Sequence, residues 1–399
     1  MLHKDGLVFP RYMLYVVHGR SMRIFKPFNI FEINYMQMQS VSERQKEESG
    51  FETVLILQGG GSLGAYECGA YKTLDKHGIK FDIVAGTSIG AVNAAIIAGY
   101  KNNPVESLEN FWLELAENVT PPSLPDNIRP YIASAYSAMW GNPKAFLPRW
   151  FVPTPDYFFP FLWQYLYDIT PLKNTLSRYV DFTKIGNPTR PRLIITSTDI
   201  ENAKPSIFDS MYDSITAEHI LASAGYPFYG ISWTQVKGKY LWDGTLLSNT
   251  PLREVIDASP KKNKKVYAIS LFPSKQHELP KNIFEVWHRA RDIMYADKTS
   301  HNVRTSKVIN RYLTLIREMH EILNQASLDA DKKAKLAKIE QEYHALACER
   351  GTIIDEIIKI QRQEDSHFLF EDADFSVTTI KNLIEKGEKD AKEVLARIQ

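Results

Sequence analysis

The sequence predicts an α/β protein in which helices cover a mostly parallel β-sheet. Between residues 51 and 100, the segments 54–57 and 81–84 each read as a strand that leads through a glycine-containing turn into a helix. Strand-like apolar runs return at residues 193–196 and 266–269. Alternating strands and helices favour a parallel sheet, because each helix carries the chain back across the sheet to the start of the next strand.

The helices of this first part have clear signals. Residues 65–77 place apolar side chains at helical spacing, and Gly78 marks the expected end of the helix. Residues 91–98 are small and apolar, which suits a helix packed tightly on a sheet. Residues 104–165 are rich in proline and aromatic side chains and cannot form one long helix. We interpret them as an insertion, either an ordinary packed one or a lid or acyl-chain pocket beside a site.

The last third of the chain is predicted to be helical. Apolar residues recur at intervals of three and four from Ile309 to Leu323 and, after a polar break, from Leu336 to Ile360. This spacing predicts a helical hairpin with a coiled-coil-like seam. The hairpin either packs on the main body or provides a contact for a homo-oligomer. The predicted organisation is therefore an N-terminal arm (1–50), a main α/β domain (51–275), which holds the sequence motifs described below, and a C-terminal helical region (276–399).

The composition and the longer apolar runs narrow the class of protein and its expected location in the cell. The 399 residues are 44% hydrophobic, enough for a sizeable core. The 48 Lys and Arg residues nearly balance 47 Asp and Glu residues, so no global field indicates a nucleic-acid partner. Two cysteines are too few for a disulfide framework. No clear signal peptide and no run of about 18 apolar residues stands out, so we expect a cytoplasmic or peripheral membrane location.

Two glycine motifs carry the candidate chemistry. Residues 86–90 read Gly-Thr-Ser-Ile-Gly, which fits a nucleophile elbow with Ser88 on a tight strand-to-helix turn. Residues 59–64 read Gly-Gly-Gly-Ser-Leu-Gly. The backbone N–H groups of Gly59, Gly60 and Gly61 can approach an anion closely, because no side chain is in the way. A nucleophile and an oxyanion cradle together indicate an acyl-transfer enzyme.

A serine nucleophile also needs a base. None of the ten histidines lies in a recognisable motif. Asp243, in the run Trp-Asp-Gly-Thr at the end of a predicted strand, is the better candidate. A carboxylate can act as a base when it lies beside the serine and is partly desolvated, because desolvation raises its proton affinity.

These residues resemble the patatin-like phospholipase family. The resemblance rests on the glycine turn at 59–64, the elbow at 86–90 and the later Asp243-Gly244-Thr245, together with the segments 222–227 and 248–251. It covers residues 51–275, and the C-terminal third is similar to a bacterial branch of the family. The resemblance implies a three-layer α/β core. Two residues depart from the family pattern: Thr245, where Gly or Ala is usual, and Leu63, where many members carry Arg or Lys.

The resemblance also implies a function. Family members use a Ser-Asp dyad without histidine, so Ser88 is expected to be the nucleophile, Asp243 the base, and Gly59, Gly60 and Gly61 the oxyanion donors. The expected reaction is hydrolysis of a phospholipid or lysophospholipid ester through an acyl-serine intermediate. It needs no metal and no cofactor. The expected partners are the lipid substrate and, by peripheral contact, a membrane.

Three alternatives remain open at this point. The spacing Gly-x-Gly-x-x-Gly at 59–64 also fits a dinucleotide-binding turn, with Asp82 as the acidic residue that follows. An α/β-hydrolase triad would use His277 or His288. Finally, a catalytically inactive scaffold of the same fold would bind lipid or a protein partner.

Overall fold

The computed structural model describes residues 51–399 with several short gaps. The gaps are 118–124, 126–127, 152–153, 156, 259–261, 277–278, 297–298, 326–328, 351–353, 364–369 and 399. The predicted N-terminal arm, residues 1–50, lies outside the described residues. Residues 51–399 form one compact unit, so the two predicted regions 51–275 and 276–399 are parts of one body.

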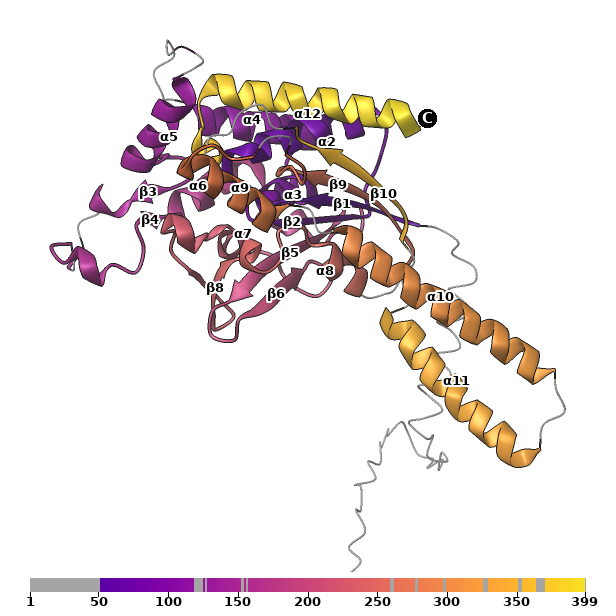
Figure 1. The fold of residues 1–399 in the computed structure, drawn as a ribbon. Helices are drawn as coiled ribbons and strands as arrows, with labels where there is room; N and C mark the ends of the chain where they lie inside the picture. Colours follow the sequence, from indigo (N-terminus) through magenta and orange to yellow (C-terminus); the bar gives the residue numbers. More distant parts are fainter. Residues whose placement is uncertain are drawn as a thin grey trace, which may run out of the picture. The chain divides into compact units, whose positions relative to one another are not determined.

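An eight-stranded sheet forms the centre of this unit (Figure 1). Five strands are parallel and lie in the order β10-β9-β1-β2-β5; the antiparallel strands β6 and β8 both pair with β5, and β7 pairs with β8. The strands are β1 (Glu52–Leu57), β2 (Ile83–Thr87), β5 (Arg192–Asp199), β6 (Lys204–Asp209), β7 (Thr234–Val236), β8 (Lys239–Asp243), β9 (Lys264–Ser270) and β10 (Ile354–Gln361). Two short strands, β3 (Leu147–Pro148) and β4 (Tyr167–Asp168), pair separately.

Both faces of the sheet are covered, which confirms the predicted three-layer α/β architecture. In β1, Leu55 and Leu57 contribute to one hydrophobic cluster, whereas Val54 and Ile56 contribute to a second one on the opposite face. This alternation follows from the two-residue period of a strand. The first cluster includes helices α2 (Gly64–Lys76), α3 (Ile89–Gly99), α4 (Pro104–Ala116), α6 (Thr170–Tyr179), α7 (Ala217–Ala224) and α12 (Val377–Ile398); the second includes α8 (Leu252–Asp257) and part of α10 (Thr299–Asn324).

The predicted insertion divides into a core part and a surface part. In α4, Phe111 and Trp112 are completely buried, so the start of the segment belongs to the main core. Between α5 (Arg129–Trp140) and residue 165, the described residues form only β3 and two turns of 3-10 helix in an otherwise irregular chain. The proline residues explain this irregularity, because proline lacks the N–H group that regular structure needs.

Besides α12, the C-terminal region holds the predicted helical hairpin, a further helix and one strand that the sequence did not predict. The helices are α9 (Ile283–Tyr295), α10 and α11 (Ala330–Arg350), and the last two pack against each other. The predicted helical spacing up to Ile360 is wrong, because residues 354–361 form β10. Ile358 and Ile360 join one core and Ile357 packs on the other, as in a strand covered on both faces. None of the helices in the described part of the chain combines the length and the apolar character needed to cross a membrane.

The last helix, α12, packs very closely on α2. A methyl group added at Gly69 of α2 would lie 1.8 Å from the carbonyl oxygen of Ile384, and one added at Gly387 of α12 would lie 2.1 Å from that of Tyr66. The two glycines therefore permit a backbone-to-backbone approach that no other residue allows. This contact joins the end of the chain to the helix that follows the first glycine turn.

We expect Gly387→Ala to lower the free energy of unfolding by about 1–3 kcal/mol, because the new methyl group overpacks the contact. In an unconstrained helix the same substitution stabilises by about 0.5–1 kcal/mol, so the sign of the effect is diagnostic. Chemical denaturation measures it. Asn382→Ala, at an exposed position of the same helix, is the control and should change stability by less than about 0.5 kcal/mol. A Gly387→Ala protein as stable as the wild type would contradict this packing.

Candidate active site

The two glycine motifs meet at one edge of the sheet. β1 and β2 are adjacent and parallel, with Leu57 in register with Gly86, so the turns that follow both strands leave the sheet side by side. A methyl group added at Gly59 would lie only 2.8 Å from Ser88 Cβ. The carboxyl edge of a parallel sheet, where loops from neighbouring strands converge, is the usual place for a binding site in α/β proteins.

Ser88 occupies a strained turn between β2 and α3. Its backbone has φ 55° and ψ −125°, a conformation that is rare for a residue with a side chain. The flanking glycines allow this turn, since a methyl group at Gly86 would lie 2.2 Å from the Gly90 carbonyl oxygen. The Ser88 amide donates a hydrogen bond of 2.9 Å to Ser223 Oγ. Strain that the surrounding structure maintains is typical of functional sites.

Asp243 ends β8 and lies completely buried beside Ser88. Burial raises the pKa of its carboxyl group to about 6, while the nearby side chains of Ser88 and Thr245 and the Thr245 amide oppose the rise. Oδ1 accepts a hydrogen bond of 2.8 Å from the Thr245 amide. Oδ2 has no hydrogen-bond partner of its own among the described residues. One carboxylate oxygen is thus available for a proton near the serine.

The glycine turn offers fewer free donors than the sequence suggests. The Gly59 amide donates to Asn249 Oδ1 at 2.9 Å, so this N–H group is already engaged. Within the described part of the chain, the amides of Gly60 and Gly61 donate no hydrogen bond. Gly61 has φ 56°, which favours glycine and turns the backbone sharply. Gly60 and Gly61 therefore remain the candidate oxyanion donors, and Gly59 is better suited to holding the turn in place.

Four polar residues to which the sequence assigned no role hold this geometry. Ser223 holds the Ser88 amide, and Asn249 holds the Gly59 amide. The backbone amide of Gln58 donates to the buried Glu67 at 2.7 Å, and the Gln58 side chain accepts from the Leu271 amide at 2.8 Å. Burial raises the pKa of Glu67 well above its ordinary value. Such contacts join residues far apart in the chain and leave no periodic pattern in the sequence.

Thr245, a departure from the family pattern, contributes to the site. A methyl group added at Gly59 would lie 2.6 Å from Thr245 Oγ1, which places this hydroxyl next to the first glycine of the turn. The hydroxyl also donates a long hydrogen bond of 3.4 Å to Asn249. The adjacent Gly244 is required by space, since a methyl group there would lie 2.4 Å from the Thr196 carbonyl oxygen.

Two of the residues of the alternative interpretations, Asp82 and His288, lie away from Ser88 and Asp243. Asp82 precedes β2 and accepts a hydrogen bond from the Thr53 amide, at the edge of the sheet opposite the glycine turn. His288 is buried against Asp292 in α9 and takes no part in the pair formed by Ser88 and Asp243. His277 lies outside the described residues. Asp82 is therefore not placed to contact the ribose of a dinucleotide bound at the glycine turn. His288 is not placed to complete a catalytic triad with Ser88 and Asp243.

A strained serine on a turn between a strand and a helix of an α/β core is a geometry found in serine hydrolases. Comparison with known proteins makes the class more specific. The family model described as patatin-like phospholipase matches residues 55–256, more than half of the chain, and a second model described as patatin phospholipase matches residues 293–399. The chain belongs to the patatin-like phospholipase family, a family of lipid ester hydrolases.

Individual relatives match over short segments only. The triacylglycerol lipase SDP1L of Arabidopsis thaliana is 33% identical over 98 residues, which are 24% of this chain and 12% of the lipase. The lysophospholipase nte1 of Aspergillus terreus is 50% identical over 44 residues, which are 11% of this chain and 3% of that protein. The chain thus matches only a small fraction of the length of these relatives.

Solved structures show distant similarity. VipD from Legionella pneumophila matches with a TM-score of 0.38 and 13% identity over 87% of this chain and 67% of VipD. The heterodimeric ExoU–SpcU complex from Pseudomonas aeruginosa matches with a TM-score of 0.32 and 14% identity, over 87% of this chain and 51% of the matched chain.

Proposed function

We propose that this chain hydrolyses a carboxylic ester bond of a lipid, a phospholipid or lysophospholipid, with Ser88 as nucleophile and Asp243 as base. The observation that carries the proposal is the buried Asp243 carboxylate, with one oxygen available, beside a serine on a strained elbow. Family membership supports the substrate class.

The reaction follows from the positions of these groups. Ser88 Oγ attacks the ester carbonyl carbon and its proton passes to Asp243. The amides of Gly60 and Gly61 donate hydrogen bonds to the oxyanion that forms, and the amino end of α3 adds a favourable field. Asp243 then returns the proton to the departing alcohol, which leaves an acyl-Ser88. Water, deprotonated by Asp243, attacks this acyl group, and the fatty acid and the free serine are released with the proton returned to Ser88.

Ser88→Ala should abolish labelling by a fluorophosphonate probe, and Asp243→Asn should slow it by about 10²- to 10⁴-fold, the range for loss of a general base. Mass spectrometry of the labelled peptide identifies the modified residue. Ser248→Ala is the matched control: its hydroxyl makes only two contacts, at 3.4 Å, and labelling should be unchanged. Full labelling of folded Asp243→Asn would contradict the assigned base.

The pKa of Asp243, about 6, predicts a pH dependence. A base must be deprotonated, so kcat/KM for a soluble short-chain ester should rise with pH, reach half of its maximum near pH 6 and then level off. Below that point it should fall about tenfold for each pH unit. A profile without an inflection between about pH 5 and 7 would show that another group controls the reaction.

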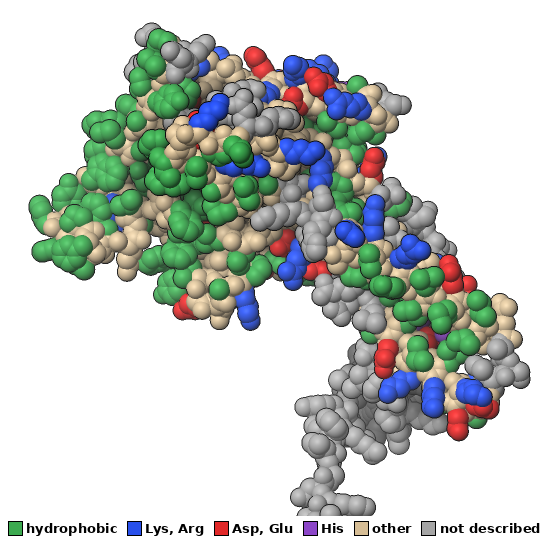
Figure 2. All heavy atoms as spheres, viewed as in Figure 1, with side chains coloured by type: hydrophobic (Ala, Val, Ile, Leu, Met, Phe, Trp, Pro, Cys, Tyr) green, Lys and Arg blue, Asp and Glu red, His purple; other side chains and the backbone are tan. Residues whose placement is uncertain are grey.

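Exposed aromatic side chains favour contact with a bilayer as the source of the lipid. We define the aromatic surface as Trp140, Phe151, Phe158, Phe159, Phe161, Leu162 and Phe228, all exposed; Phe158, Phe161 and Phe228 have exposed fractions of 83%, 81% and 79%. Figure 2 shows the apolar side chains gathered over α5, β3 and β4. Aromatic rings suit the boundary between lipid headgroups and acyl chains.

Few charges interrupt the aromatic surface, and it connects to the site. Arg149, within this region, is buried with its guanidinium 4.6 Å from the centre of the Tyr165 ring. Lys144 pairs with Glu114.

The Leu166 amide donates to the Gly230 carbonyl group, in the loop that follows α7 and Ser223. We therefore propose that the aromatic surface meets the bilayer and brings the substrate toward Ser88.

The double variant Phe158→Ser/Phe161→Ser should reduce vesicle binding by at least about tenfold, because each ring loses up to about 1.5–3 kcal/mol of apolar burial in the bilayer. Sedimentation with phosphatidylcholine vesicles measures binding, and activity on a soluble ester should stay unchanged. Ile322→Ser, at an equally apolar position of α10 that is 68% exposed, is the control and should bind as the wild type does. Equal binding by all three proteins would rule out the aromatic surface as the contact.

A further inference from the structure

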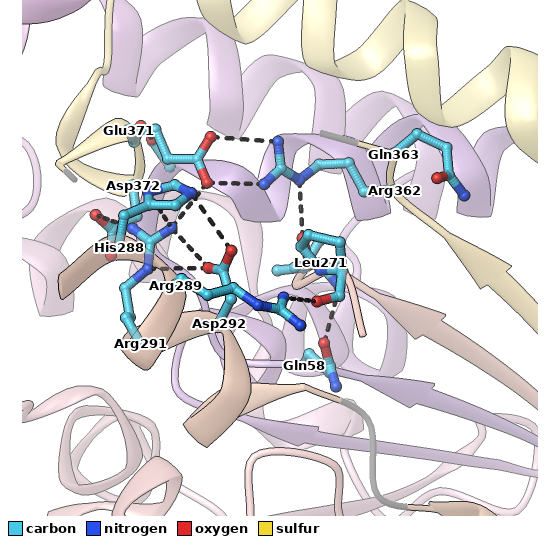
Figure 3. A network of polar contacts seen from close by, with 12 residues as sticks. Gln58, Leu271, His288, Arg289, Arg291, Asp292, Arg362, Gln363, Glu371 and Asp372 are labelled. Carbon is cyan, nitrogen blue, oxygen red and sulfur yellow. Dashed lines mark hydrogen bonds and ion pairs between the residues drawn. The ribbon is translucent and has the colours of Figure 1, made fainter. Parts of the chain in front are cut away.

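A buried network of charged side chains connects through Leu271 to Gln58, which precedes the glycine turn (Figure 3). Arg291 of α9 contacts three carboxylates: its Nη2 lies 3.0 Å from Asp292 Oδ1 and 2.9 Å from Glu371 Oε1, and its Nη1 lies 3.4 Å from Asp372 Oδ1. Glu371 and Asp372 belong to the short 3-10 helix Glu371–Ala373. Arg362, after β10, also pairs with Glu371 at 2.8 Å. All of these side chains are less than a tenth exposed.

Each charge in the network depends on its partners, because buried charges are stable only when they are paired and hydrogen-bonded. Removing one partner would leave an uncompensated charge next to the site. One of its members, Arg362, also bonds to an uncharged group of the core. Arg362 Nε donates to the Leu271 carbonyl group at 2.8 Å, and the Leu271 amide donates to the side chain of Gln58, just before the glycine turn. The C-terminal segment is thereby fixed against the start of the turn.

The same 3-10 helix touches the glycine turn itself. A methyl group added at Gly61 would lie 2.3 Å from the Asp372 carbonyl oxygen, so the two backbones are in close contact. The neighbouring Ser62 donates its hydroxyl to the Glu371 carbonyl group at 3.1 Å. The position of the Gly60 and Gly61 amides thus depends on a segment more than 300 residues later in the chain.

Asp372 also reaches the other side of the site. Its Oδ2 accepts a hydrogen bond of 2.7 Å from the Tyr229 hydroxyl. Tyr229 belongs to the segment that begins with Ser223, which holds the Ser88 amide. In that segment, the Gly225 carbonyl group accepts from the Asp243 amide at 3.0 Å. One segment therefore contacts both members of the proposed dyad and ends on the carboxylate of Asp372.

We infer that Asp372 is a positioning residue that holds the glycine turn in register with Ser88 and Asp243. Its carbonyl group fixes the turn at Gly61, and its carboxylate fixes the dyad side through Tyr229. Arg291 holds that carboxylate in place. This inference rests on the proposed function, because the register matters for stabilising an oxyanion formed at Ser88. Oxyanion donors must lie within a few tenths of an ångström of their working position to be effective.

Tyr229→Phe tests the inference with the removal of one hydroxyl group. We expect kcat for a soluble ester to fall about tenfold while KM changes by less than about twofold, since the loss falls on the transition state. Fluorophosphonate labelling of Ser88 should slow by a similar factor. Hydrogen exchange in the peptide 58–64 should become faster. Asp372→Asn keeps the backbone carbonyl group and an amide oxygen for Tyr229. Its kcat should therefore lie between those of Tyr229→Phe and the wild type.

Tyr66→Phe is the matched control. The Tyr66 hydroxyl donates to Asp390 Oδ2 at 2.9 Å, which makes a second tyrosine–aspartate pair between the core and the C-terminal region, on α2 and α12; Tyr66 is buried and Asp390 is half-buried. We expect a loss of thermal stability like that of Tyr229→Phe, with kcat unchanged. A tenfold loss of kcat in both variants would show that general destabilisation causes the effect and would overturn the inference.

The remaining outcomes separate the inference from the proposed function. If the wild type is labelled at Ser88 but Tyr229→Phe and Asp372→Asn keep full kcat and normal exchange, the inference is wrong and the proposed function stands. If the folded wild type is not labelled, the proposed function fails. Hydrogen exchange in peptide 58–64 then decides alone: faster exchange in Tyr229→Phe than in Tyr66→Phe supports the coupling to the turn, and equal exchange overturns it.

Discussion

The parallel pairing of β1 with β2 is the constraint on which the site depends. It places Leu57 beside Gly86, so the two turns that follow leave the sheet at the same edge, and a glycine turn meets a serine elbow with no room for a side chain at Gly59. The antiparallel strand β8 pairs with the end of β5, beyond the residues that pair with β2, and adds Asp243 opposite Ser197. Three turns far apart in the sequence become one site through strand register alone.

The buried carboxylate has an energetic cost that the fold must offset. A completely buried acid, with one oxygen that has no hydrogen-bond partner among the described residues, is less stable than the same group in water, and the strained backbone at Ser88 adds to this cost. Both unfavourable features lie within a core whose strands are buried on both faces, where many apolar contacts maintain them. The raised pKa of Asp243 is the chemical consequence of this cost, because a carboxylate that water does not stabilise binds a proton more readily.

How much of the fold and the site can be predicted from the sequence depends on how far apart in the chain the interacting residues lie. The elbow at Ser88 and the glycine turn follow from local sterics, which a few adjacent residues determine. Asp243 is predicted from its place at the end of a strand and from the resemblance, although no spacing links it to a serine 155 residues earlier. β10 was misread as helix because β-branched residues three and four apart fit either structure over a short run. Asn249 and Arg291 were not assigned at all, because a single polar residue in contact with a distant segment produces no pattern.

A turn of three consecutive glycines is poorly suited to its proposed role by itself. Glycine has the widest backbone freedom of any residue, and donors that must hold a transition state need one fixed position. Rigidity must therefore come from outside the turn. Gln58 and Asn249 hold its beginning, and the segment around Asp372 holds its centre. Because β10 and α12 attach that segment to the sheet and to α2, the C-terminal third of the chain acts as part of the site. The freedom that lets the glycine amides approach a charged oxygen is then limited by contacts from the rest of the fold.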